Sequence, residues 1–193
     1  MLWYSYFTTD DNIAYYFKSG PWREVFANTI EHHIETNATL GLLPELGNEW
    51  SLSFEFRPTD YILTADTNLL QLTTGEPSSE QGSRTPMIGF EHGANEKANL
   101  VVTSSLNSDP NYPLRFVTIP APKLGKWTKI EIDQRQEGCK YFLVVSLANK
   151  EVVRKENENP RKFSNVTVFA SSPFLPAQPG SIKNLSIMSN TGA

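Results

Sequence analysis

Apolar and polar residues alternate along many short segments of this chain. The clearest segment is residues 50–56, which Pro58 follows closely. Its apolar members are Trp50, Leu52, Phe54 and Phe56. A period of two places these four side chains on one face of a strand, with serine and glutamate on the other face. Because proline cannot continue a central strand, the segment is predicted to end there.

Similar segments recur along the rest of the chain. Strands are predicted at 68–73, 86–90, 98–103, 114–119, 126–133, 141–147, 151–155, 166–169 and 182–187, and residues 29–35 form a strand or a single helical turn. Turns are predicted at 134–138 and 149–150. A break in the alternation between Trp127 and Ile130 indicates a β-bulge. Short strands at this spacing, without a long helical period, are typical of an all-β sandwich.

Length and composition favour one ordered domain. The chain has 193 residues, of which 39% are hydrophobic and 20% charged. This length suits one sizeable core, and this composition argues against disorder. We therefore expect a single sandwich domain over residues 1–193. Residues 1–40, which begin with an aromatic-rich stretch, are expected to form an N-terminal extension that covers one sheet edge.

Charge and targeting signals limit the partners and the cellular location that the sequence predicts. The formal net charge is −4 without a basic cluster, which argues against a nucleic-acid partner. No apolar run is long enough for direct membrane insertion, and the first residues lack signal-peptide features. Three glycosylation sequons, at Asn37, Asn165 and Asn184, favour a secreted or cell-surface glycoprotein. The single cysteine, Cys139, is expected to be an unpaired thiol in a strand or turn, or else to pair with another chain.

Residues 42–188 resemble the extracellular laminin-G-like modules of the concanavalin A-like lectin/glucanase superfamily. The matching pieces, in order, are LGNEWSLSFEFRPT, NLLQLTTG, the Arg-Thr-Pro turn before MIGF, LGKWTKIEID, YFLVVSLANKEV and FSNVTVFASSPFLPAQPGSIKNLSI. The resemblance implies an all-β, two-sheet antiparallel jelly-roll sandwich. It does not fix the function, because this fold serves lectins, adhesion modules, glucanases and lyases.

One strand carries residues that bear on catalysis. Glucanases of the resembling superfamily carry a Glu-x-Asp-x-x-Glu pattern, whose carboxylates act as nucleophile and general acid. Here Glu131 and Asp133 match the first two positions, but Gln136 occupies the third. Glu137 is one residue too far along and is expected on the opposite face. The incomplete pattern predicts no catalytic residues, and the alternative interpretation is a solvated strand face beside Lys129.

A short polar segment contains candidate metal ligands. Asp60, Asp66 and Asn68 supply oxygen ligands of the type that calcium prefers. Some laminin-G-like modules and legume-type lectins use calcium, so the resemblance points the same way. The alternative is that these residues form turns. No other cofactor is expected.

Loops at the sandwich ends carry the candidate ligand-binding residues. Saccharides are bound by aromatic faces together with amide and charged groups that reach the hydroxyls. The predicted ligand-binding residues are Arg84, Asn107, Asn111 and Tyr112. Phe174 and Gln178 belong to the same set, although Phe174, bracketed by prolines, is expected to cap the core instead.

These observations favour an extracellular, non-enzymatic recognition module that binds a glycan or a protein partner. Two alternatives remain open. One is a polysaccharide-degrading enzyme of the same fold. The other is a structural domain that helps a larger receptor or matrix protein to assemble, with no small ligand.

Overall fold

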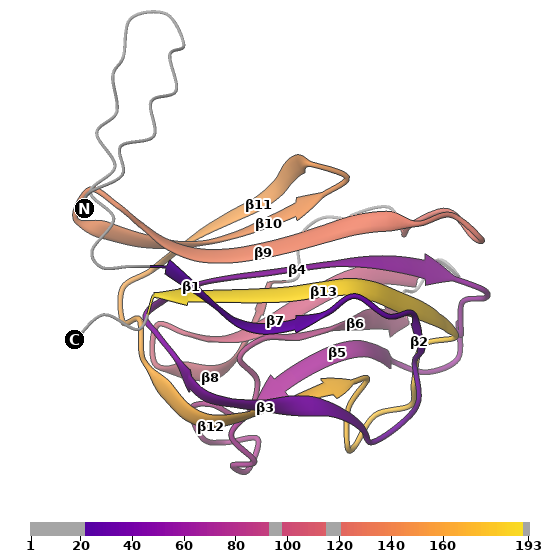
Figure 1. The fold of residues 1–193 in the computed structure, drawn as a ribbon, viewed down its shortest axis with the longest axis horizontal. Helices are drawn as coiled ribbons and strands as arrows, with labels where there is room; N and C mark the ends of the chain where they lie inside the picture. The colour runs from indigo at the N-terminus through magenta and orange to yellow at the C-terminus, as the bar shows by residue number, and fades with distance from the viewer. Residues whose placement is uncertain (1–21, 93–97, 115–120, 191–193) are drawn as a thin grey trace, which may run out of the picture.

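The computed structural model describes residues 22–92, 98–114 and 121–190 (Figure 1). Over these ranges the chain forms thirteen β-strands in two antiparallel sheets that pack face to face. The predicted all-β, two-sheet jelly-roll sandwich is therefore confirmed. In the described part of the chain, no helix has the length and apolarity needed to cross a membrane.

The first sheet, called sheet A here, has seven strands. In spatial order, six of them are β1 (Trp22–Asn28), β13 (Gly180–Asn190), β4 (Glu49–Pro58), β9 (Thr128–Glu137), β10 (Lys140–Leu147) and β11 (Lys150–Asn157). The two-residue strand β2 (His32–His33) pairs with the first part of β13. The first and last described strands are neighbours, with Trp22 opposite Asn190.

The second sheet, sheet B, has six strands. In spatial order they are β3 (Ala38–Leu46), β12 (Phe163–Ala170), β5 (Thr67–Thr73), β6 (Met87–His92), β7 (Ala98–Leu106) and β8 (Asp109–Leu114). Most of the predicted strand at 114–119 lies outside the described residues, as do residues 1–21 of the predicted N-terminal extension. The later part of that extension includes β1, an edge strand of sheet A.

The core lies between the two sheets, as the alternation in residues 50–56 predicts. Trp50, Leu52, Phe54 and Phe56 are at most 1% exposed. They face the interior together with Ile130 and Ile132 of β9 and with leucines and valines of sheet B. Burying such side chains contributes roughly 1.5–3 kcal/mol each, so this apolar layer holds the sheets together.

Strand β9 differs from its prediction in two ways. Its pairing with β4 runs from Thr128 to Gln134 without a register shift, so the predicted bulge is absent from this stretch. The strand also continues to Glu137, and the turn is confined to Gly138 and Cys139. Since residues i and i+2 share a face, Trp127 lies on the outward side with Lys129, not among the core residues.

The turn between β10 and β11 is as tight as predicted, one residue earlier in the sequence. Ala148 and Asn149 both have positive φ angles, 50° and 63°. Two such residues in succession form the mirror-image turn that matches the twist of a two-stranded hairpin. The hairpin extends sheet A on the side away from β1 (Figure 1).

Candidate functional site

The outward face of sheet A carries many polar and charged side chains. Strand β9 alternates between buried Ile130, Ile132 and Gln134 and outward residues. Its outward residues, the preceding Trp127 and outward residues of β13, β4, β10 and β11 define the outer face: Ser51, Ser53, Glu55, Arg57, Trp127, Lys129, Glu131, Asp133, Arg135, Glu137, Phe142, Glu151, Arg154 and Lys183.

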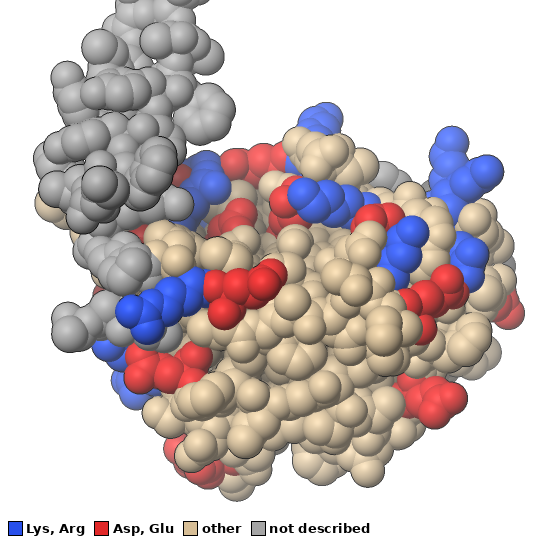
Figure 2. Space-filling model, in the orientation of Figure 1, with Lys and Arg blue, Asp and Glu red and all other residues tan. Residues whose placement is uncertain are grey.

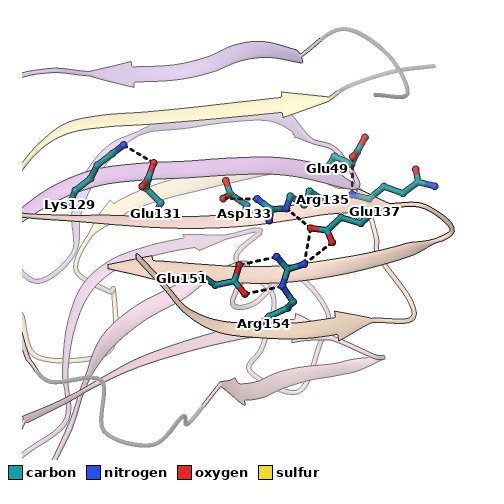
Figure 3. Close-up of polar contacts among 9 residues, drawn as sticks. Glu49, Lys129, Glu131, Asp133, Arg135, Glu137, Glu151 and Arg154 are labelled. Atoms are coloured by element: carbon teal, nitrogen blue, oxygen red, sulfur yellow. Dashed lines mark hydrogen bonds and ion pairs between the residues drawn. The ribbon is translucent and has the colours of Figure 1, made fainter. Parts of the chain in front are cut away.

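The charged residues of β9 pair with one another along the strand (Figure 3). Lys129 Nζ lies 2.6 Å from Glu131 Oε1, and Arg135 Nε donates a 2.8 Å hydrogen bond to Glu137 Oε1. Arg135 Nη1 also lies 3.9 Å from Asp133 Oδ2. Because Arg135 contacts both carboxylates, Glu137 shares the face of Asp133, and the prediction that it lies on the opposite face is wrong.

Arg154 of β11 continues this network across the sheet (Figure 3). Its guanidinium donates to Glu137 Oε2 at 2.7 Å and to Glu151 Oε2 at 2.8 Å. It also lies over the ring of Phe142, 5.4 Å from the centroid. Hydrogen bonds from Arg154 hold the pKa of Glu151 below its ordinary range. Because Arg154 is bonded to two carboxylates, its side chain and those of Glu137 and Glu151 are restricted to one arrangement.

Asp133 is the outer-face carboxylate whose pKa burial raises. Burial raises its pKa above the ordinary value, while a hydrogen bond with Ser51 and the nearby Arg135 act in the opposite direction. The charge of Glu131 adds to the upward shift. A carboxyl with a raised pKa is suited to donate a hydrogen bond or a proton.

The other end of the outer face contains an aromatic ring between strands. Trp127 lies beside Arg57, whose Cζ is 4.6 Å from the ring centroid, and beside Lys183, whose Nζ is 4.3 Å away. Arg57 comes from β4 and Lys183 from β13, and Trp127 directly precedes β9, so the cluster joins two strands and the start of a third. Aromatic rings therefore lie at both ends of the outer face, each beside a cation.

The asparagines predicted to bind ligand in the end loops form hydrogen bonds within the protein. Asn107 has a φ of 51°, and its side-chain oxygen accepts a 2.7 Å hydrogen bond from Glu158 N. Its backbone N–H donates to Asn157 Oδ1 at 3.1 Å. The amide of Asn111 donates to the carbonyl of Ser78. These bonds fix the end loops, and they occupy part of the hydrogen-bonding capacity that a ligand would use.

The other two predicted ligand-binding residues, Arg84 and Tyr112, both lie beside β7. The carbonyl of Arg84 accepts a 3.0 Å hydrogen bond from Ser105 N, which ties its loop to β7. Tyr112 on β8 pairs with Ser104 of β7 and packs against the core, with Lys155 Nζ 5.4 Å from its ring centroid. Ligand binding by these residues stays a prediction.

The candidate calcium ligands have different surroundings. Asn68 is fully buried in β5, and its amide donates a 3.1 Å hydrogen bond to Ser171 O. Asp60 and Asp66 are exposed, and Asp60 Oδ1 accepts a hydrogen bond from Tyr61 N. Across residues 22–92, 98–114 and 121–190, no three His, Cys, Asp or Glu side chains are placed to hold a metal ion. A calcium site here stays a prediction.

Gln178, a candidate ligand-binding residue, is buried, and Phe174, expected in the core, is exposed. Gln178 is fully buried, accepts a 2.6 Å hydrogen bond from Thr67 Oγ1 and donates to the carbonyl of Asp60. Phe174 is 84% exposed, so the expectation that it caps the core is wrong. Gln178 anchors the loop through its side chain, and Phe174 projects from the anchored loop.

Sequence reasoning considered Glu131 and Asp133 but missed the residues that complete the outer face, namely Arg57, Trp127, Arg154 and Lys183. The period of two shared by Trp127, Lys129 and Glu131 is the one local signal that marks Trp127 as outward. Cys139 is a free, exposed thiol in the turn after β9, as expected.

Comparisons with known proteins were made at the levels of sequence and structure. No protein-family model and no curated protein matches the sequence. A heptameric pentraxin from Limulus polyphemus superposes with a TM-score of 0.56 at 12% identity, covering 83% of this chain and 76% of the pentraxin. The carbohydrate recognition domain of Emp47p gives 0.52 at 10% identity, covering 94% and 91%. The alginate lyase vAL-1 from Chlorella virus gives 0.50 at 13% identity, covering 88% and 91%.

These neighbours include binding proteins and an enzyme, so they identify the architecture and leave the activity open. The two-sheet arrangement and the overlap with each neighbour support the resemblance found in the sequence motifs. The chain has the concanavalin A-like lectin/glucanase fold.

Proposed function

We propose that this chain is a non-enzymatic carbohydrate-recognition module of a secreted or cell-surface protein, and that the saccharide binds on the outer face of sheet A. The observation that carries the proposal is the outer face itself. It carries charged side chains held by ion pairs (Figure 3). Serine hydroxyls of β4 lie beside them, and the aromatic rings of Trp127 and Phe142 lie toward its two ends.

This arrangement suits a saccharide for physical reasons. Sugar hydroxyls are donors and acceptors, and the outer face offers both along β9, with Lys129 and Arg135 as donors and carboxylates as acceptors. Trp127 and Phe142 offer apolar surface for the C–H faces of sugar rings. With a rise of about 3.3 Å per residue, the stretch from residue 127 to 135 spans roughly 26 Å, which is long enough for several sugar units.

Two further observations support a binding role outside the cell. One structural neighbour is itself described as a carbohydrate recognition domain. The side chains of Asn37, Asn165 and Asn184 are all exposed, so all three sequons have an asparagine at the surface. Pairing of Glu131 with Lys129 at 2.6 Å also favours a fixed, charged carboxylate over a reacting one.

A glycan array followed by calorimetric titration of the best ligand tests this proposal. Trp127→Ala and Glu131→Gln are expected to weaken binding at least about tenfold, the loss that corresponds to 1.4 kcal/mol. Lys162→Gln, on the segment before β12, is a matched surface control and is expected to bind normally. If Arg84→Gln weakens binding and the outer-face variants do not, the saccharide binds at the end loops and the proposed site is wrong.

A second candidate function is polysaccharide cleavage at Glu131 and Asp133. The raised pKa of Asp133 favours it, because burial makes this carboxyl hold its proton more tightly, as a general acid requires, and Glu131 lies two residues away on the same face. Release of reducing ends or unsaturated products from glucans and uronans, abolished by both Glu131→Gln and Asp133→Asn, would establish this activity. Tight binding without product release would support the recognition module.

A further inference from the structure

The cluster around Trp127 has the features of a site for a negatively charged group. Arg57 and Lys183 lie on the neighbouring strands β4 and β13, and Trp127 directly precedes β9, with both cations within 4.6 Å of the ring centroid. The register places Lys183 opposite Glu55, and Glu55 opposite Lys129. Three cations are therefore gathered at one end of sheet A, beside a single aromatic ring.

The acidic partners of these cations hold them only partly. Arg57 Nη2 lies 2.5 Å from Glu31 Oε1, and Lys183 Nζ lies 3.6 Å from Glu55 Oε2. The side chains of Arg57 and Lys183 remain 35% and 29% exposed. A guanidinium has five N–H donors, so a single carboxylate oxygen leaves most of its donors available to a ligand.

Additional positive charge comes from the segment that leads into Trp127. Lys123 and Lys126 are both exposed. This turn is tied to the end of β4, because Gly125 N donates a 2.8 Å hydrogen bond to the carbonyl of Pro58, the residue after Arg57. Figure 2 shows basic and acidic side chains together near the end of sheet A where β4 finishes.

We infer that the Trp127 cluster binds the carboxylate-bearing unit of an acidic saccharide, a uronic acid. This inference rests on the proposed function and adds the class of sugar. The ring of Trp127 would hold Arg57 and Lys183 in place, and these two cations would reach the carboxylate of the sugar. Arg pairs with carboxylates in a planar, two-bond geometry while stacking on an aromatic ring, so it suits both parts of such a unit.

Glu31 has a distinct role in this inference. Its carboxylate is bonded to Arg57 Nη2 in the free protein, so its negative charge opposes a second carboxylate at the same guanidinium. Removing the Glu31 charge is therefore expected to strengthen uronate binding, whereas removing the Arg57 charge weakens it. A site for neutral sugars would not give this opposite pair of effects.

The test compares an oligouronate with its carboxyl-reduced counterpart, a neutral saccharide of the same length and linkage. Binding is measured by calorimetry at low and high salt. The wild-type protein is expected to bind the oligouronate at least about tenfold more tightly, with a difference that shrinks as salt rises. Arg57→Gln and Lys183→Gln should remove this preference, and Glu31→Gln should increase it. Lys140→Gln, at the far end of sheet A, should leave it unchanged.

The outcomes separate this inference from the proposed function. If both saccharides bind equally and the Arg57, Lys183 and Glu31 variants have no effect, the module binds sugars but the uronate inference is wrong. If Lys140→Gln removes the preference as fully as Arg57→Gln, the effect comes from overall charge and the inference is also wrong. If no saccharide binds in the array or by calorimetry, the proposed function itself is contradicted.

Discussion

The side chains of Asn157 and Gln134 are hydrogen-bonded in the interior, with Asn157 Nδ2 2.7 Å from Gln134 Oε1. Asn157 Oδ1 also accepts a hydrogen bond from Asn107 N, and Gln134 Nε2 donates to the carbonyl of Asn48 at 2.7 Å. These bonds join sheet A to the β7–β8 turn of sheet B. Every polar atom of the Asn157 amide therefore has a partner in another element.

Asn157→Ala is expected to lower the free energy of unfolding by about 1–3 kcal/mol, because it leaves Gln134 Oε1 and Asn107 N buried without partners. Urea unfolding followed by tryptophan fluorescence measures this loss. Asn159→Ala, which removes only an exposed bond to Ser108, should change stability much less. Equal losses in the two variants would contradict the structural importance of the buried pair.

Asp133→Asn is expected to stabilise the fold near neutral pH and to have little effect in acid. Burial raises the folded-state pKa of Asp133 above its unfolded value, so the folded protein binds the proton more tightly. Stability from the protonated form is present below the unfolded pKa and is lost as pH rises through the folded pKa. Thermal unfolding of both proteins at several pH values from about 3 to 7 measures the difference. A variant that is less stable at pH 7 would contradict this account.

Arg154→Met is expected to destabilise the protein by about 0.5–1 kcal/mol near neutral pH, a small effect because the ion pairs are partly exposed. Burial opposes ionisation of Glu137, but hydrogen bonds from Arg154 and Arg135 outweigh it and lower its pKa, and the pKa of Glu151 is lowered as well. Depressed carboxyl pKa values give stability above the unfolded pKa that is lost as pH falls through the folded pKa.

The difference between wild type and Arg154→Met should therefore vanish in strong acid and shrink in high salt. Chemical unfolding of both proteins at neutral and acidic pH, with and without added salt, measures it. A difference that persists at low pH would indicate that packing of Arg154 on Phe142, not its charge, supports the hairpin.

Tyr61 is expected to resist ionisation in alkaline solution. Its hydroxyl donates a 2.5 Å hydrogen bond to the carbonyl of Pro122, its ring packs edge-on against Phe90, and burial raises its pKa well above the ordinary value. Stability from the neutral phenol is present below about pH 10 and is lost at higher pH. The phenolate absorbance of wild type minus that of Tyr61→Phe should stay flat until the protein unfolds. A difference that titrates near pH 10 in folded protein would contradict the burial.

Much of the sandwich follows from the period of two in the sequence. Strands such as β4 and β9 bury every second side chain, so their inner faces can be recognised locally. The errors have physical causes. The bulge predicted between Trp127 and Ile130 is absent because Trp127 is an apolar residue on the outward side, so the break in the pattern is not a break in the strand. Phe174 was assigned to the core because of its flanking prolines, but the anchoring of its loop by Gln178 is a long-range contact.

The candidate site was less predictable than the fold. Its charged half on β9 was visible as Glu131 and Asp133, whose partners lie two residues away. Trp127, Arg57 and Lys183 come together only through the pairing of β4, β9 and β13, and this strand order has no local signature. A site assembled from several strands depends on how those strands pair, and the pairing register cannot be read from the sequence.

The antiparallel pairing of β1 with β13 has a consequence for how the molecule is presented. Trp22 and Asn190 lie side by side, and Arg57 pairs with Ser181, nine residues before Asn190 along an extended strand. At about 3.3 Å per residue, Asn190 is therefore roughly 30 Å from the part of β13 beside Arg57. An attachment point beside Trp22 and Asn190 would leave the Trp127 cluster open to incoming ligand.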